Sequence, residues 1–317
     1  MSATRRQPDP KAPKILCIGI PVRDLTYRIQ ELPGRGEKIR ADAFDEIVGG
    51  NALNAAIGIV RLGGRTLLSG PIGDPTETTS EYIYEKLAEE GIEANLQRVE
   101  GVVTAVSNVM IDPSGERTIV TWRDPRLYDV QLPDIGELLD GCAAVLTENR
   151  CAPFATDLCV EATRRKIPVV LDADVVMSMR EGLLNAASHL IFSVEALTAT
   201  AGTTQLEDAL RRVAEQTPGF VAVTRGSQGM MWLDGAGRIQ VMPTFPVHTV
   251  DTLGAGDIFH GAFALAITEG RGIPEAMRFA SAAAALKCTR FGGAFAAPER
   301  AEVEALLARG SPKMAGT

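Results

Sequence analysis

This sequence is poor in the residue types that mark several protein classes. Aromatic residues make up 5% of its 317 residues, and its three histidines stand far apart, at positions 189, 248 and 260. Zinc sites use clustered His, Cys or carboxylate ligands, so zinc catalysis has little support. No stretch approaches the roughly 20 consecutive apolar residues of a membrane span. We therefore expect no association with a membrane.

Cysteine and positive charge are also scarce. The five cysteines are scattered without a C-x-x-C pair, and an odd number of separated cysteines is typical of reduced thiols, which predicts a cytoplasmic protein. The net charge is -8 and no segment forms a basic stripe. Nucleic acid is therefore not an expected partner. The polar start predicts a disordered tail at residues 1–13, and the end, residues 310–317, is expected to be frayed.

Short β-branched runs alternate with helical segments along most of the chain. The strand-like runs are 15–20, 66–69, 143–146, 169–172, 189–192 and 220–224, and clear helical segments are 51–62, 80–90 and 153–166. This alternation predicts an α/β fold of three αβα layers, with a doubly wound, mostly parallel sheet covered on both faces. Two segments, near 24–48 and 102–124, alternate like strands and predict a small β-sheet lid over a pocket.

The run Asp251-Thr252-Leu253-Gly254-Ala255-Gly256-Asp257 carries the chemistry. It precedes apolar residues spaced as on a buried helix face, so the loop opens a helix. Unpaired N–H groups and the positive end of the helix dipole meet there, and the glycines let a phosphate approach the backbone. Asp257 then suits a general base that accepts the proton of an attacking hydroxyl in phosphoryl transfer. Taken alone, Asp257 could equally be an ordinary helix N-cap.

Two other nucleotide-binding patterns are absent. Phe259 stands where the dinucleotide pattern G-x-G-x-x-G needs its third glycine, which argues against a dehydrogenase. The sequence G-x-x-x-x-G-K-[ST] does not occur, which excludes a P-loop NTPase.

Residues 251–261 resemble the C-terminal signature of the ribokinase-like, or phosphofructokinase B type, carbohydrate kinases. The N-terminal hallmark of that family is matched by Gly49-Gly50-Asn51-Ala52-Leu53-Asn54-Ala55-Ala56, with Arg61-Leu62-Gly63 at the expected distance. Within that family, the motifs resemble those of ketohexokinases and bacterial sulfofructose kinases. The resemblance extends over about residues 15–307. It implies a kinase domain at 14–309 that uses ATP and Mg²⁺ to phosphorylate a sugar.

The resemblance also implies roles for individual residues. It gives Arg117 a place near the transferred phosphate, beside the anion loop of Gly254, Ala255 and Gly256. Asn51 and Asn54, three residues apart, share one helix face and can direct amide groups at sugar hydroxyls. The implied sugar contacts are Asp24, Gly50, Asn51 and Asn54. The implied nucleotide contacts are Thr224, Gly226, Gly229, Thr252, Gly254, Gly256 and Lys287. Helix caps, turns and solvated side chains are the competing interpretations.

The metal ligands stay open. Many members of the family carry an Asn-x-x-Glu motif for Mg²⁺, but this sequence has Ser193-Val194-Glu195-Ala196, so Glu195 is the remaining protein candidate. Magnesium is expected to arrive with ATP. Asp251 and the loop Phe291-Gly292-Gly293 match the region of a monovalent-cation site, which makes K⁺ a further candidate cofactor.

The sugar also stays open. Lys38 and Arg150 match the basic pair that sulfofructose kinases use for the sulfonate, and both could equally be surface charges. We expect transfer to a primary hydroxyl of a ketose, either fructose-like or acidic. A nucleoside kinase and a non-catalytic sugar-binding regulator are the alternatives. The resemblance further implies a homodimer built through the lid, because an exposed small sheet has edges that invite pairing.

Overall fold

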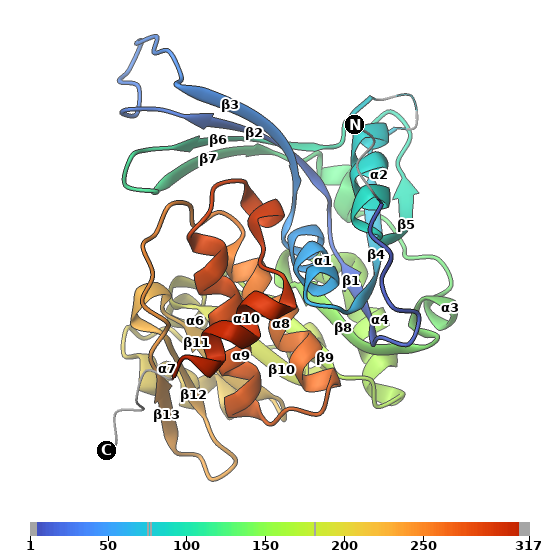
Figure 1. Cartoon of the computed structure of the whole chain (residues 1–317). Coiled ribbons are helices and arrows are strands. Elements are labelled where there is room, and N and C mark those ends of the chain that lie inside the picture. The colour runs from blue at the N-terminus through green and yellow to red at the C-terminus, as the bar shows by residue number, and fades with distance from the viewer. Residues whose placement is uncertain (1–4, 75, 77, 181, 311–317) are drawn as a thin grey trace.

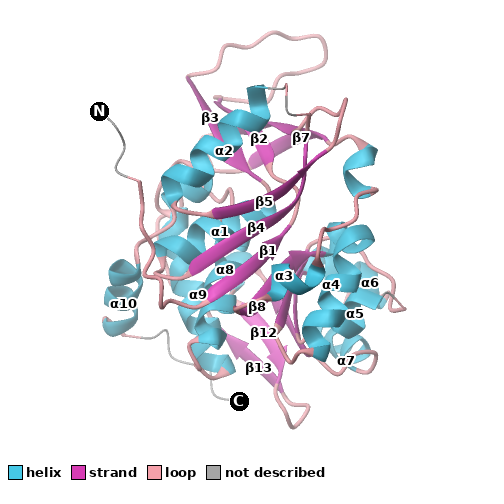
Figure 2. Cartoon of the chain, turned by 90° about the vertical axis from the view of Figure 1, so that its right-hand side faces the viewer, coloured by secondary structure: helices cyan, strands magenta, loops and turns pink. Residues whose placement is uncertain are grey.

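The structure, a computed structural model, describes residues 5–74, 76, 78–180 and 182–310. Within these residues the largest element is a nine-stranded sheet in the order β13-β12-β11-β10-β9-β8-β1-β4-β5 (Figures 1 and 2). The strands from β11 to β5 run parallel, and β12 and β13 pair antiparallel at one edge. The bounds are β1 (Lys14–Ile18), β4 (Arg65–Ile72), β5 (Glu93–Arg98), β8 (Cys142–Glu148), β9 (Val169–Ala173), β10 (His189–Ser193), β11 (Phe220–Thr224), β12 (Met230–Leu233) and β13 (Ile239–Met242).

Helices cover both faces of this sheet (Figure 2). One face holds α1 (Asn51–Arg61), α2 (Thr78–Glu90), α8 (Ala255–Thr268), α9 (Ile273–Cys288) and α10 (Arg300–Ala308). The other holds α3 (Ile135–Leu139), α4 (Ala152–Arg164), α5 (Gly182–Ala186), α6 (Val194–Ala201) and α7 (Leu206–Ala214). Side chains alternate across a strand, so Ile15 and Cys17 pack on the first group while Leu16 and Ile18 pack on the second. The predicted three-layer α/β fold is confirmed.

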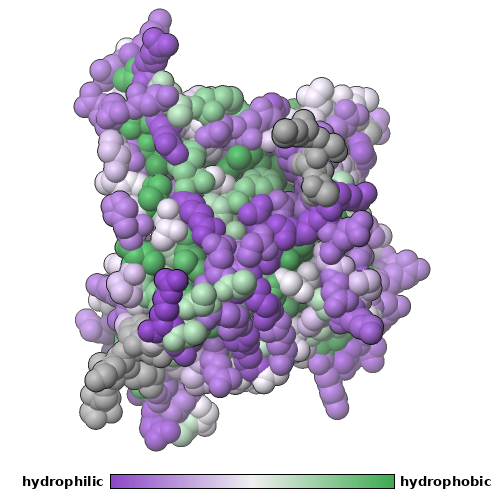
Figure 3. Space-filling model, in the orientation of Figure 1, coloured by the Kyte–Doolittle hydropathy of each residue, from purple (hydrophilic) through white to green (hydrophobic). Residues whose placement is uncertain are grey.

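A separate four-stranded sheet forms the lid. Its order is β3-β2-β6-β7, with bounds β2 (Val22–Arg28), β3 (Ala43–Gly49), β6 (Ala105–Ile111) and β7 (Arg117–Trp122). In Figure 1 this sheet arches over the rest of the molecule. The loop between β2 and β3 projects at the upper left, and Figure 3 shows hydrophilic residues gathered at its tip. The small second sheet predicted from the alternating segments is thus present.

The amino-terminal segment contacts the rest of the molecule. Residues 5–13 lie beside α2, where the Arg6 amide donates to the Glu89 carbonyl at 2.9 Å. The Arg6 guanidinium pairs with Glu299 at 2.7 Å and with Glu90 at 3.5 Å. These contacts hold Arg6 against α2 and Glu299. The disordered tail stays a prediction, and residues 1–4 and 311–317 lie outside the described part. Among the described helices, none has the length and apolar character that crossing a membrane requires.

Candidate active site

A cavity of about 790 Å³ lies between the lid and the carboxyl ends of the central strands. Asp172 of β9, Ser193 of β10 and Thr224 of β11 line its floor, and lid residues including Asp24 and Arg117 line its roof. Ligands of open α/β sheets bind outside the carboxyl ends of the strands. This cavity is therefore the candidate active site.

The amino end of α8 opens into the cavity. Gly254 caps the helix with φ of 78°, in the left-handed region that favours glycine. A Cβ added to Gly256 would meet no atom within 4 Å, so open space lies beside its backbone. Amides in the first turn of a helix have no intrahelical partner, and the helix dipole adds positive potential there. The geometry suits a bound phosphate.

Asp257, in this first turn, joins the two sequence motifs. Its Oδ2 accepts a hydrogen bond of 2.7 Å from Nδ2 of Asn54 on α1. Burial raises the pKa of the Asp257 carboxyl to about 7, and the charge of Asp172 adds to this effect. The Asn54 hydrogen bond and His260 oppose it. The result is a carboxylate that lines the cavity and can exchange a proton near neutral pH.

Asp24 reaches the cavity from the lid strand β2. It is buried, and burial raises its pKa to about 6, against the opposing effects of a hydrogen bond from Ser107 and the charge of Arg123. A Cβ on Gly49 would lie 2.0 Å from the Asp24 carboxylate. Gly50 has φ of 97° and would place a Cβ 2.4 Å from the Ile20 carbonyl oxygen. The paired glycines thus leave room for the carboxylate and for the entry into α1.

Two carboxylates at the cavity floor, and a third that is buried behind them, were missed from the sequence. Asn51 donates to Asp172 at 3.1 Å and to Asp174 at 3.3 Å. Glu148, 1% exposed, lies beside Arg150 at 3.5 Å, and neither of its oxygens accepts a hydrogen bond within the described residues. Burial raises the pKa of both Asp172 and Glu148. Their positions in the sequence could have indicated them, because each of the three carboxylates lies at or just after the carboxyl end of a buried strand, where ligands of such sheets bind.

His260 connects α8 to the floor. It is 4% exposed; its Nδ1 lies 2.7 Å from the Gly256 carbonyl oxygen and its Nε2 lies 3.3 Å from that of Ile191. Nε2 also lies 3.5 Å from Asp172. Burial lowers the pKa of the imidazole, so the neutral form prevails at neutral pH. His260 therefore positions the first turn of α8 against β10.

The pfkB family carbohydrate kinase profile matches residues 12–300. The chain belongs to the pfkB family of carbohydrate kinases. The ribokinase of Bacillus subtilis is 27% identical over 297 residues, covering 92% of this chain and 99% of that relative. A crystal structure from Agrobacterium tumefaciens, provisionally named a ribokinase, is 37% identical with a TM-score of 0.89, covering 94% of this chain and 98% of that one. An Arabidopsis thaliana ribokinase complexed with ribose and ATP is 25% identical with a TM-score of 0.78, covering 93% and 99% of the two chains.

A pfkB kinase is a phosphotransferase that acts on an alcohol group of a sugar, and the cavity collects most of the predicted sugar contacts. Asp24, Gly50, Asn51 and Asn54 all line it. The predicted basic pair is not brought together. Arg150 lines the cavity, but its guanidinium is paired with Asp174 and lies 3.5 Å from Glu148. Lys38 is exposed in the β2–β3 loop and does not line the cavity.

Near the amino end of α8, a hydrogen bond joins the lid of this pfkB kinase to its core. Nη1 of Arg117, at the start of β7, donates to Oγ1 of Thr252 at 2.6 Å. Thr224 lines the cavity, whereas Gly226 and Gly229 belong to the turn after β11 and do not line it. A Cβ on Gly229 would lie 2.1 Å from the Met242 carbonyl oxygen. Close packing against the end of β13 therefore explains this second glycine.

Lys287 does not face a nucleotide as predicted. It is fully buried near the end of α9, and its ammonium lies 2.9 Å from the Asp251 carboxylate. That carboxylate also accepts backbone hydrogen bonds from Leu253, Gly292 and Gly293. The predicted K⁺ region is therefore already supplied with a cation, and these residues do not fit a separate K⁺ at the Asp251 carboxylate.

Glu195 is exposed on α6 and does not line the cavity, so it is poorly placed for the role proposed from the sequence. Within the described ranges, no group of three or more His, Cys, Asp or Glu side chains is arranged to hold a metal ion. Mg²⁺ commonly binds through one or two carboxylates together with substrate phosphates. The floor carboxylates suit that mode better than a preformed cage.

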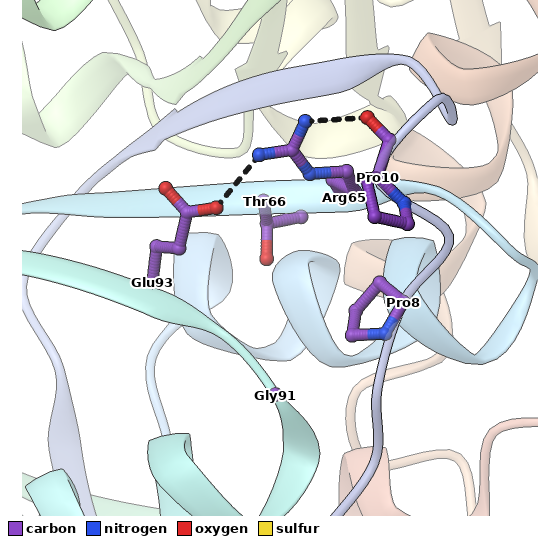
Figure 4. Close-up of a pocket in the computed structure, with 6 residues that line it drawn as sticks. All are labelled: Pro8, Pro10, Arg65, Thr66, Gly91 and Glu93. Carbon is purple, nitrogen blue, oxygen red and sulfur yellow. Dashed lines mark hydrogen bonds and ion pairs between the residues drawn. The ribbon is translucent and has the colours of Figure 1, made fainter.

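A second hollow, of about 210 Å³, lies at the amino ends of β4 and β5 (Figure 4). Arg65 donates there to the Pro10 carbonyl at 3.0 Å and to Glu93 at 2.9 Å. Arg65, the cationic residue that lines this hollow, is thus already paired. The hollow lies at the end of the sheet opposite the pfkB kinase cavity. We assign it no role in the reaction.

Proposed function

We propose that this kinase transfers the γ-phosphate of ATP to a primary hydroxyl of an uncharged sugar, with Asp257 as the general base. The observation that carries the proposal is the Asn54–Asp257 hydrogen bond of 2.7 Å at the mouth of α8. This hydrogen bond supports the proposal because it holds a carboxyl, whose pKa is raised to about 7, at the amino end of a helix, where anions bind favourably. ATP as donor is supported by the Arabidopsis thaliana ribokinase, which was solved with ribose and ATP.

The reaction follows from this arrangement. The sugar hydroxyl oxygen attacks the γ-phosphorus, its proton passes to the Asp257 carboxylate, and the bond to the bridging oxygen breaks to release ADP. Amides of the first turn of α8 stabilise the charge that develops on the transferred group; removing one such donor typically costs about 3–4 kcal/mol. Mg²⁺ would enter with ATP and neutralise phosphate charge. Arg117, fixed by Thr252, is placed to contact the same phosphate.

An uncharged sugar fits the cavity better than an acidic one. Asp24, Asp172, Asp174 and Asp257 line it, and buried Glu148 lies behind them. The Arg150 guanidinium is already neutralised by Asp174 and Glu148, and Arg123 interacts with Glu148. An anionic substituent would lie among these carboxyls, and of the predicted Lys38–Arg150 pair only Arg150 lines the cavity, where it is already paired with Asp174. Arg117 and Arg123 are the other arginines that line it. Among uncharged sugars, the ketose predicted from the sequence remains a candidate beside ribose.

A coupled ADP-release assay tests the substrate class. We expect turnover with fructose or ribose and at least about tenfold lower kcat/KM with a sulfonated ketose. Preference for the sulfonated ketose, with loss of that preference in Lys38→Ala and Arg150→Ala, would overturn the choice of an uncharged sugar. Preference for a nucleoside would favour the nucleoside kinase. Ligand-induced thermal stabilisation without ADP release from any sugar would favour the regulator.

The role of Asp257 is tested by Asp257→Asn, beside Asp45→Asn on the exposed strand β3 as a matched control. Positioned proton transfer contributes about 10²–10⁴-fold, so kcat should fall by that factor in Asp257→Asn and stay unchanged in the control. Binding of the sugar, followed by calorimetry, should be retained in both variants. Near-normal turnover of Asp257→Asn would show that the base lies elsewhere.

We also propose that the enzyme works in the cytoplasm as a homodimer joined through the lid. The lid leaves Phe44 55%, Val120 61% and Trp122 57% exposed, and β3 and β7 are its open edges. Open sheet edges and exposed apolar side chains favour pairing. Light scattering after size-exclusion chromatography should give a dimer mass that falls to the monomer mass in Phe44→Asp. A wild-type monomer mass would refute the dimer.

A further inference from the structure

Lys287 is a buried cation that the proposed reaction does not use. It stands in the last turn of α9 with no exposed surface. Its Nζ donates to the backbone carbonyl of Asp251 at 2.8 Å and pairs with the Asp251 carboxylate at 2.9 Å. A buried ammonium costs several kcal/mol of lost hydration unless it is well paired. Because burying this ammonium costs free energy, we expect Lys287 to have a function at the adjacent candidate phosphate site.

Asp251 is the point where three backbone segments meet. One carboxylate oxygen accepts from the Leu253 amide at 2.8 Å, and the other accepts from Gly292 at 3.3 Å and Gly293 at 3.2 Å. The Asp251 amide itself donates to the Cys288 carbonyl at 3.2 Å. The ammonium is the one side-chain cation within ion-pair distance of this carboxylate in the described structure. It therefore offsets the negative charge of the carboxylate that joins these segments.

The same segments shape the mouth of α8. Gly254 follows Leu253 directly, and its Cβ position would lie 3.5 Å from the Ala294 amide and 3.6 Å from Asn54. Arg117 donates a hydrogen bond to Thr252, which precedes Leu253. A shift of Asp251 would thus move Gly254 and Thr252, and with them the amides that receive phosphate. These contacts connect Lys287, through Asp251, to the candidate phosphate site at the amino end of α8.

We propose that the Lys287 ammonium is a covalently attached monovalent cation that positions the loop 251–256, so that this kinase works without K⁺. The inference rests on the proposed kinase function. An ammonium group and a potassium ion carry the same charge, are of similar size and are both satisfied by carbonyl and carboxylate oxygens. Lys287 is a positioning residue, because it acts through Asp251 and touches neither the sugar nor ATP.

The first test compares salts at equal ionic strength. Wild-type kcat and KM for ATP should change by less than about twofold when K⁺ or NH₄⁺ replaces tetramethylammonium. Lys287→Met removes the charge but keeps the volume, so in tetramethylammonium its kcat/KM for ATP should fall by about 100-fold. Addition of K⁺ or NH₄⁺ should restore most of this loss, because the free ion can enter beside Asp251. A merely structural role for Lys287 predicts no such rescue.

A second readout needs no catalysis. The melting temperature of Lys287→Met should rise with K⁺ concentration, since an ion that binds only the folded state stabilises it, whereas the wild type should not respond. Lys86→Met is the matched control, because it also deletes an ammonium paired with a carboxylate at 2.8 Å, on α2 away from the cavity. Neither its activity nor its melting temperature should respond to K⁺.

Several outcomes would overturn the inference. Activation of the wild type by K⁺ of more than about tenfold, or a Lys287→Met variant equally active in all salts, is incompatible with it. So is a Lys287→Met variant that loses activity and is not rescued. If Lys287→Met fails to fold, the variant with Lys287→Met and Asp251→Asn removes both charges, and its failure to fold as well would reject the pairing argument. Absence of ADP release by the wild type refutes the kinase function instead, and the melting experiment still decides the ion question.

Discussion

The pH dependence of kcat/KM offers the sharpest test of the site. This parameter reports the ionisation of the free enzyme, and the base must be deprotonated to accept a proton. An ordinary aspartyl group, with a pKa near 3.9, would leave activity flat between about pH 6 and 8. Asp257 has a pKa of about 7 instead. At pH 6 only about one eleventh of it is ionised and at pH 8 about ten elevenths, so kcat/KM should rise about tenfold between these values.

The cause of this raised pKa can be tested separately. After burial, the charge of Asp172 is the largest influence that raises the pKa of Asp257. In Asp172→Asn the rising limb of the plot of kcat/KM against pH should move to lower pH, because the like charge is gone. The two carboxyls titrate as a pair, so the limb belongs to the pair and not to one residue. Coupled ADP-release assays at saturating ATP and low sugar concentration give the profile.

A second cavity carboxyl must be distinguished. Burial raises the pKa of Asp24 to about 6, so this group could also produce a limb in the range. In Asp24→Asn we expect weaker sugar binding with the limb still near pH 7. A limb that disappears in this variant, or that lies below pH 5 in the wild type, would refute the assignment of Asp257 as the base.

Three further predictions follow from single contacts. Asp257→Asn should raise the melting temperature at pH 8 and leave it unchanged near pH 4. The pKa of Asp257 is higher in the folded than in the unfolded protein, so the folded protein loses stability as pH rises through about 7. Equal shifts of the melting temperature at both pH values would contradict this. Arg117→Ala breaks the bond to Thr252 and should lower kcat about 10–100-fold with sugar affinity kept, as steady-state kinetics would show. Gly49→Ala would place a Cβ 2.0 Å from the Asp24 carboxylate and should raise the KM for sugar at least about tenfold; an unchanged KM would mean that Asp24 does not hold it.

The sequence predicts the parts of the molecule whose signals are local. The glycines before Asp257 locate the start of α8, because a left-handed cap and an apolar helix face are both visible in a short run. The alternating segments locate the lid for the same reason. The contact between Asn54 and Asp257 spans 203 positions and was reached only through resemblance, which places both residues in one site.

The parts that were missed depend on neighbours far along the chain. Asp172 and Glu148 each look like a single carboxylate at the end of a strand. Only the order β9-β8-β1 brings Asp172 to Asn51 at the start of α1. Lys287 has the position of a basic residue that complements the last turn of a helix. Its full burial is set by the loops at Asp251 and Gly292, whose course no local pattern in the sequence describes.

Asp24 on the lid and Asp257 on α8 both line the cavity, which bears on how ATP is protected from hydrolysis. In the proposed reaction, a sugar with several hydroxyls on one ring would contact both carboxylates at once. A water molecule is too small to do so. Under that proposal the sugar itself completes the site, so ATP would be hydrolysed only slowly while no sugar is bound.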